Sequence, residues 1–141
     1  MKFRYGKMDW LTLERGQENC YLLTNGLGGF SSSTIVNSNT RNDHAFFMGS
    51  KKAPNERINL IYKLEEWITI DGINYPVSTQ QYLDKIQDSH KYLAEFSFED
   101  YPEWIYLYEG VELVKSIAMK QGENTIAVCY EVINETEKPV T

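Results

Sequence analysis

The stretch that decides the fold comprises residues 104–120 and reads WIYLYEGVELVKSIAMK. Aromatic and β-branched residues flank Glu109-Gly110 on both sides, a composition typical of two strands joined by a tight turn. A second turn at residues 122–124 leads into residues 125–133, where apolar residues recur at every second position. The stretch therefore predicts a β-hairpin that is extended by a third antiparallel strand.

Further strands are expected on the N-terminal side of this stretch. They are two strands within Phe3–Arg15, one at His44–Gly49, one long strand over Arg57–Ile70, its hairpin partner Ile73–Val77 across Asp71-Gly72, and Tyr92–Phe98. Residues 51–56, with Pro54, are expected to form a charged turn, and the polar residues 78–91 to be irregular with room for a short helix. The whole predicts an all-β fold, an antiparallel β-sandwich.

Length and charge limit the organisation and the partners. The 141 residues fit a single domain over residues 1–141. The net charge of −6 argues against nucleic acid and against an anionic membrane surface, both of which select basic proteins. The sequence has neither a signal pattern nor an apolar run of the ~18 residues needed for a membrane span. We therefore expect a cytoplasmic protein.

The cysteines and histidines indicate neither a metal site nor a cofactor. Cys20 and Cys129 are far apart, with no Cys-x-x-Cys spacing, which favours reduced structural thiols and leaves a disulfide or redox role as the alternative. The two histidines are His44 and His90, of which His90 is expected at the surface, and two histidines without a cysteine cluster make a metal site improbable.

Residues 21–44 contain Gly26, Gly28 and Gly29 followed by a run of Ser, Thr and Asn. A dinucleotide-binding loop would need a third glycine where Ser31 stands, and a Walker loop would need Gly-Lys-Ser/Thr. Neither phosphate-binding pattern fits. We expect these three glycines to shape the loop by allowing positive φ angles and close backbone packing.

Six short segments follow one another along most of the chain. They are Tyr21–Phe30 with Asn39-Thr40-Arg41 and His44, then Lys63–Glu66, Tyr75–Thr79, Tyr92–Phe96, Pro102 with Trp104, and Gly122–Thr125. In this order they resemble the N-terminal domain of bacterial and archaeal glycogen debranching enzymes of the amylo-α-1,6-glucosidase type. The resemblance implies a β-supersandwich that precedes an (α/α)₆ catalytic barrel. Independently of the resemblance, residues 139–141 follow a polar turn and look like the start of another strand, so we expect the chain to be a piece of a longer protein, with a naturally frayed tail as the alternative.

The chain departs from the family pattern at four positions. Tyr21 stands where the family usually has Trp, Ser33 and Ala45 where it tends to have Gly, and Asp43 where it tends to have an aromatic residue. The glycine losses indicate a different loop geometry. Asp43 argues against a stacking role beside His44.

The resemblance places the catalytic acids in the barrel, outside this chain. Glycoside hydrolysis needs two carboxyl groups roughly 5 to 9.5 Å apart. Glu65 and Glu66 are adjacent on a predicted strand, so their side chains would point to opposite faces. We therefore assign no catalytic residue here and expect this chain alone to be inactive.

Asn25, Arg41 and His44 are the candidate substrate-binding residues, because amide, guanidinium and imidazole groups all suit sugar hydroxyls. We expect them to rim a glucose-binding cleft next to the barrel. The alternative is that Arg41 and His44 only fix the shape of the loop. Trp67 is the tryptophan expected to be exposed and able to stack on a sugar ring, although tryptophans more often fill a core.

Two classes of function remain open. One is a non-catalytic domain of an α-glucan debranching hydrolase, with an oligosaccharide and the C-terminal barrel as partners. The other is a free-standing carbohydrate-binding or protein-interaction sandwich. A domain without its barrel should expose an apolar patch and unpaired sheet edges, through which it can dimerise.

Overall fold

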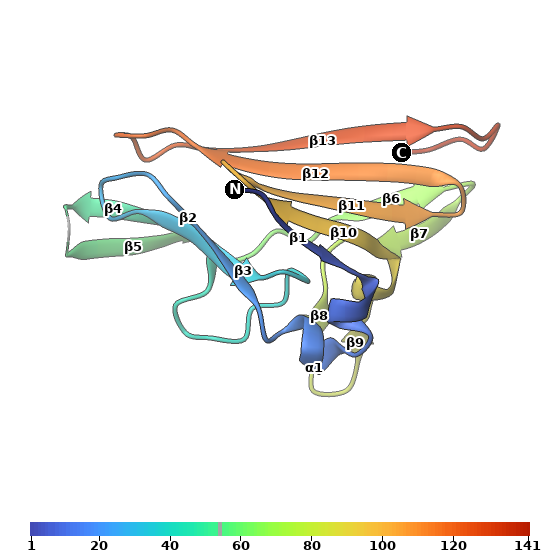
Figure 1. The fold of residues 1–141 in the computed structure, drawn as a ribbon, viewed down its shortest axis with the longest axis horizontal. Coiled ribbons are helices and arrows are strands. Elements are labelled where there is room, and N and C mark those ends of the chain that lie inside the picture. The colour runs from blue at the N-terminus through green and yellow to red at the C-terminus, as the bar shows by residue number, and fades with distance from the viewer. Residues whose placement is uncertain (54) are drawn as a thin grey trace.

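The computed structural model describes residues 1–53 and 55–141 and consists mainly of two antiparallel sheets (Figure 1). The five-stranded sheet has the order β1 (Phe3–Gly6), β10 (Leu93–Phe98), β11 (Pro102–Tyr108), β12 (Val111–Met119) and β13 (Ile126–Asn134). The four-stranded sheet has the order β2 (Cys20–Thr24), β3 (Phe30–Thr34), β4 (Ala45–Lys52) and β5 (Glu56–Ile61). The predicted all-β sandwich is confirmed. The predicted turn at residues 51–56 includes Pro54, which lies outside the described residues.

The stretch that opened the sequence analysis forms the central part of the larger sheet. Strand β11 pairs with β12 across Glu109-Gly110, and β12 pairs with β13 over nine residue pairs, from Val111↔Asn134 to Met119↔Ile126. Glu109 and Gly110 both have positive φ angles, 47° and 87°, as a two-residue hairpin turn requires. The predicted three-strand succession is therefore confirmed.

Two small hairpins and three short helical segments complete the fold. The hairpins are β6 (Trp67–Ile70) with β7 (Ile73–Pro76), and β8 (Gln80–Gln81) with β9 (Ile86–Gln87). The helical segments are η1 (Lys7–Trp10), α1 (Leu13–Gly16) and η2 (Ser89–Tyr92). Val140 forms an antiparallel bridge with Ile70, so residues 139–141 adopt the expected strand-like pairing. No helix among the described residues has the length and apolar character that crossing a membrane requires.

Aromatic rings fill the space between the sheets. The rings of Tyr21 and Trp104 meet edge to face with centroids 5.2 Å apart, and the ring of Phe96 lies 5.3 Å from that of Trp104. The indole of Trp104 donates a hydrogen bond to Ile35 O at 2.8 Å. Tyr21, on β2, thereby connects the four-stranded sheet to β10 and β11.

The prediction of a second strand within Phe3–Arg15 is wrong. After β1 the chain forms η1 and α1, because two side chains cap these turns. The Asp9 carboxylate accepts a hydrogen bond from Gly6 N, and the Thr12 hydroxyl accepts one from Arg15 N. Trp10 and Leu13 are both buried, at a spacing that suits a helical turn better than a strand.

The prediction of one long strand over Arg57–Ile70 is also wrong. Strand β5 ends at Ile61, and β6 begins only at Trp67. The intervening segment turns because its polar side chains find partners elsewhere: Lys63 Nζ donates to Thr79 O, and Glu66 pairs with Lys115. Glu65 and Glu66 consequently precede a strand instead of lying within one.

In the polar segment 78–91 the structure contains one short 3-10 helix, η2, in addition to the β8–β9 hairpin. The possible short helix is thus found at the end of that segment. His90 is partly buried here and does not lie at the open surface that the sequence predicted.

Candidate functional site

The turn between β2 and β3 is organised by the buried side chain of Asn25. Its Oδ1 atom accepts hydrogen bonds from Leu27 N at 2.9 Å and from Gly29 N at 3.0 Å. Its Nδ2 atom donates to Glu123 O at 3.1 Å and to Asn124 Oδ1 at 3.2 Å. Asn25 therefore binds the hairpin turn to the β12–β13 turn, and its amide is fully used inside the domain.

The three glycines of this turn meet two different structural requirements. Gly26 and Gly28 have φ angles of 79° and 94°, the left-handed region that other residues rarely adopt. Gly29 instead has close neighbours, because a Cβ atom there would lie 2.5 Å from Asn25 Nδ2 and 3.0 Å from Met48 O. The turn thus needs glycine for conformation at two positions and for space at the third.

A groove of about 600 Å³ runs along the β2–β3 hairpin, and we call it the hairpin groove. It combines apolar side chains with two arginines and one aspartate. Its lining residues include Cys20, Leu22, Phe30, Arg41, Asp43 and Arg57.

Arg57 is held in place at the edge of the hairpin groove. Its Nε atom donates to Gly28 O at 2.8 Å, and its guanidinium lies 5.5 Å from the centroid of the Phe30 ring. Arg41 is exposed and has no hydrogen bond or ion pair from its side chain within the described residues. Arg41 is consequently the lining arginine whose donors are free for a ligand.

His44 lies beneath this groove and fixes the shape of the loop. Its Nδ1 atom accepts hydrogen bonds from Thr40 N at 3.0 Å and from Arg41 N at 3.3 Å. Since Nδ1 accepts, the ring proton is on Nε2, which lies 3.5 Å from Cys20 Sγ. Burial lowers the pKa of His44, so the neutral ring is favoured.

Cys20 therefore has a histidine neighbour that sequence spacing did not reveal. Its thiol is free, as is that of Cys129. Burial raises the pKa of Cys20, which keeps it a thiol and disfavours nucleophilic chemistry. Because Nε2 already carries a proton, His44 is in the wrong tautomer to act as a base toward this thiol.

The four predicted ligand residues do not come together in the structure. Arg41 lines the hairpin groove, whereas Asn25 and His44 are buried and serve its architecture. Trp67 is 52% exposed on β6, as expected, but does not line the hairpin groove. Sequence reasoning missed Arg57, whose position opposite Gly28 depends on the pairing of β4 with β5.

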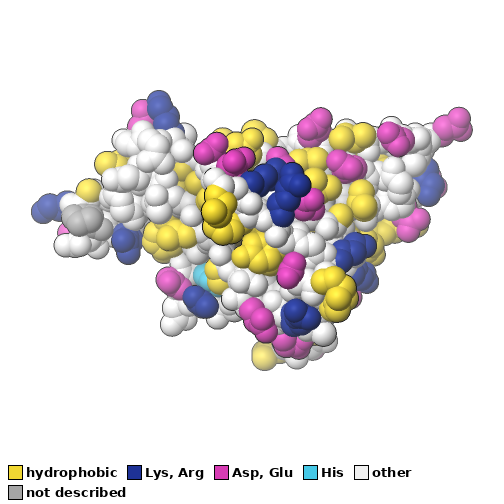
Figure 2. Space-filling model, in the orientation of Figure 1, with side chains coloured by type: hydrophobic (Ala, Val, Ile, Leu, Met, Phe, Trp, Pro, Cys, Tyr) yellow, Lys and Arg dark blue, Asp and Glu magenta, His cyan; other side chains and the backbone are white. Residues whose placement is uncertain are grey.

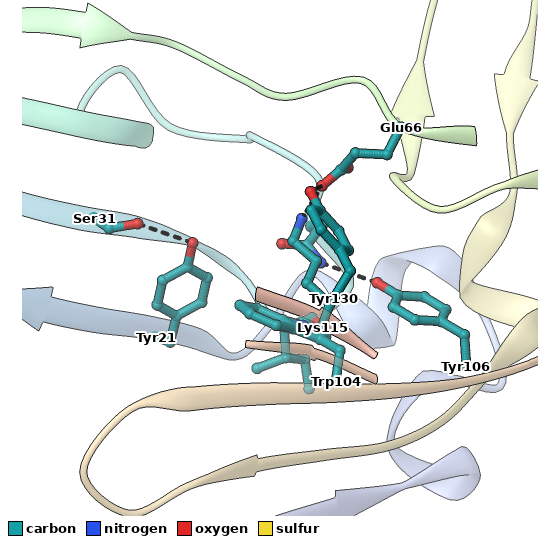
Figure 3. Close-up of polar contacts among 9 residues, drawn as sticks. Tyr21, Ser31, Glu66, Trp104, Tyr106, Lys115 and Tyr130 are labelled. Atoms are coloured by element: carbon teal, nitrogen blue, oxygen red, sulfur yellow. Dashed lines mark hydrogen bonds and ion pairs between the residues drawn. The ribbon is translucent and has the colours of Figure 1, made fainter. Parts of the chain in front are cut away.

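A buried charged cluster lies between the β12–β13 strands and the segment before β6 (Figure 3). Glu66 Oε1 accepts hydrogen bonds from Lys115 Nζ and from the Tyr130 hydroxyl, both at 2.5 Å. Lys115 Nζ also lies 5.6 Å from the Trp104 ring centroid. Burial lowers the pKa of Lys115, while the Glu66 carboxylate acts in the opposite direction. The signal in the sequence was a lysine between the inward residues Leu113 and Ile117.

The fold and the hairpin groove define a β-sandwich domain with one open, arginine-bearing face. The family model described as "Glycogen debranching enzyme N terminal" matches residues 19–141, and the chain belongs to this family. No curated protein and no solved structure gives a significant match to the chain.

Proposed function

We propose that this chain is a non-catalytic domain of a glycogen debranching enzyme that helps to hold an α-glucan beside a separate catalytic domain. Membership of the family supports the link to glycogen. The observation that carries the proposal is the hairpin groove, whose lining combines the free Arg41 with the apolar residues Leu22 and Phe30. Such a surface offers hydrogen-bond donors to sugar hydroxyls and apolar contacts to the C–H faces of the ring.

The contacts of the adjacent carboxylates Glu65 and Glu66 support a non-catalytic role. Glu66 is committed to Lys115 and Tyr130, while Glu65 accepts a hydrogen bond from the Tyr82 hydroxyl at 2.9 Å. The two carboxylates thus have separate structural partners. A general acid and a nucleophile for glycoside hydrolysis would instead face one substrate bond together.

An apolar surface next to the hairpin groove is the proposed contact with the catalytic domain. It lies where the edge strands β1 and β2 approach each other, and Figure 2 shows hydrophobic side chains gathered in this region. We call it the strand-edge patch, and its members are Phe3, Tyr5, Cys20, Leu22 and Phe98. Phe3 and Leu22 are both more than half exposed. An exposed apolar patch of this kind is typical of a docking surface.

The groove is tested by Arg41→Ala in a protein that carries both this domain and the catalytic domain. We expect kcat/KM for a branched oligosaccharide to fall about tenfold, since a charged donor would be lost. Arg15→Ala, on the exposed side of α1, is the matched control and should leave turnover unchanged. Unchanged kcat and KM in Arg41→Ala would contradict the proposal for the hairpin groove.

The patch is tested by Leu22→Asp in the same protein, with Leu107→Asp on β11 as the control, since Leu107 is also an exposed leucine. Leu22→Asp should separate the unfolding of the two domains in calorimetry, whereas Leu107→Asp should preserve one transition. In the isolated chain the same patch is expected to join two copies through their sheet edges. Sedimentation of Leu22→Asp should then show a monomer.

A further inference from the structure

A second groove, with a different set of lining residues, lies between the loop after β3 and the β8–β9 hairpin. Its volume is about 540 Å³. We call it the amide groove, because its lining is almost entirely amide and hydroxyl side chains: Gln17, Ser38, Asn39, Thr40, Gln80, Gln81, Tyr82 and Leu83. Not one of these residues carries a formal charge. The volume is within the range of about 300–1,000 Å³ found for small-molecule sites.

Several of these side chains are held at one end by bonds within the domain. Gln80 Oε1 accepts a hydrogen bond from Lys63 Nζ, so the Nε2 group of Gln80 remains available as a donor. Gln17 Nε2 donates to Ser38 Oγ at 2.9 Å, which leaves Gln17 Oε1 available as an acceptor. Groups that are already oriented lose less entropy when a ligand binds.

Asn39 and Tyr82 are held in the same way. Asn39 accepts a hydrogen bond from the Ser33 hydroxyl at 2.7 Å and donates one to Tyr62 O at 2.9 Å. The Tyr82 hydroxyl donates to Glu65, and the residue is 43% exposed, so part of its ring is open to solvent. Such a ring can pack against the C–H face of a sugar.

Other groups of the amide groove are free to bind. Within the described residues, the side chains of Thr40 and Gln81 make no hydrogen bond. Thr40 supplies a hydroxyl, and Gln81 supplies both an acceptor and two donors. The groove therefore presents donors and acceptors together, which suits a ligand whose hydroxyl groups do both.

The charge distribution selects the class of ligand. Two nearby charged residues, Lys63 and Glu65, are engaged with Gln80 and Tyr82, and no charged residue lines the groove. An anionic ligand such as a phosphate would need cationic donors, and a divalent cation would need carboxylates. An uncharged polyhydroxylated ligand needs neither.

We propose that the amide groove binds a short segment of an uncharged oligosaccharide, at a site separate from the hairpin groove. The identity of the sugar, an α-1,4-linked glucan, rests on the proposed function, whereas the site itself rests on its lining. A branched glucan would then contact the domain in two grooves, whose linings adjoin at Thr40 and Arg41.

The experiment is a titration of the 141-residue chain with maltohexaose. Isothermal calorimetry measures the affinity, and NMR chemical-shift mapping locates the binding site. We expect shifts at residues 38–40 and 80–83. Gln81→Ala and Tyr82→Ala should each weaken binding about tenfold, as loss of a hydrogen bond or an apolar contact implies. Tyr101→Ala removes a tyrosine that is 46% exposed and does not line the groove, so it should change the affinity less than twofold.

The outcomes separate this inference from the proposed function. Wild-type affinity in both Gln81→Ala and Tyr82→Ala overturns the inference, and so does an absence of maltohexaose binding to the wild-type chain. Neither result affects the Arg41→Ala test, because the hairpin groove is assayed by turnover with the catalytic domain present. Shifts at residues 38–40 and 80–83 with inorganic phosphate, in place of those with maltohexaose, would also overturn the uncharged ligand class.

Discussion

The ammonium group of Lys115 lies 2.5 Å from the carboxylate of Glu66, in an environment where the two side chains are only 3% and 14% exposed. A buried pair of this kind gives little net stability relative to apolar residues, but the loss of one partner leaves an uncompensated charge. The pair joins β12 to the segment that the sequence pattern assigned to a long strand. It therefore explains both the break after β5 and the position of β6.

Lys115→Met should destabilise the domain by about 3–5 kcal/mol, because Glu66 would stay buried without its counter-ion. Lys115→Met combined with Glu66→Leu should recover a large part of the loss. Urea unfolding measures both. Lys120→Met, which removes the exposed pair with Glu123, should cost less than about 1 kcal/mol. A double variant no more stable than Lys115→Met would contradict this interpretation.

Asn25→Ala should lower the free energy of unfolding by about 2–4 kcal/mol. The change leaves the amides of Leu27 and Gly29 without their acceptor and frees the β12–β13 turn. Chemical denaturation provides the measurement. Asn42→Ala is the matched control, because Asn42 is exposed, and it should have almost no effect. Equal stabilities of the two variants would show that the hydrogen bonds of Asn25 do not stabilise the domain.

Gly29→Ala should cost about 1–3 kcal/mol, since its Cβ atom would meet the side chain of Asn25 and the carbonyl of Met48. Gly6→Ala is the control, because a Cβ atom at that position would have no atom within 4 Å other than those of its chain neighbours. Thermal unfolding of both variants tests the difference. A Gly29→Ala protein as stable as Gly6→Ala would mean that the turn can relax.

The free energy of unfolding should decrease as the pH falls below about 6.5. Burial lowers the pKa of His44 from its ordinary value of 6.5, so the unfolded chain binds a proton there more readily than the folded chain. Burial acts in the same direction on His90. The stability that the two neutral histidines contribute is therefore fully present above pH 6.5 and is lost progressively below it.

His44→Gln should reduce this pH dependence, as measured by urea unfolding between pH 5 and pH 7. His90→Gln is the companion variant and should remove the part of the pH dependence that His90 contributes. If both variants keep the full wild-type slope, neither histidine is the source, and carboxylates must account for the change in stability.

The hairpins could be predicted because their signals are local. Asp71-Gly72 and Glu109-Gly110 determine their turns through residues a few positions apart. The segment before β6 could not be predicted in this way, since Glu66 turns inward to a lysine 49 positions later. Alternation along Arg57–Ile70 was consistent with a strand, but burial of that charge pair overrode it.

The candidate site was predicted in part for the same reason. Arg41 was correctly associated with the glycine turn, because both belong to one continuous loop and hairpin. Gln17 and Gln80 were not associated with Asn39, because the amide groove forms only when three separate segments meet. Side chains that meet through tertiary contacts leave no spacing pattern in a single sequence.

The hydrogen bonds between Asn25 and the β12–β13 turn also limit the order in which the chain can fold. Its partners Glu123 and Asn124 follow it by 98 and 99 residues, so they leave the ribosome long after the hairpin that they hold. Contacts across such a separation form late, after the local hairpins. During synthesis the β2–β3 turn therefore lacks these two hydrogen bonds until residues 123 and 124 have been made.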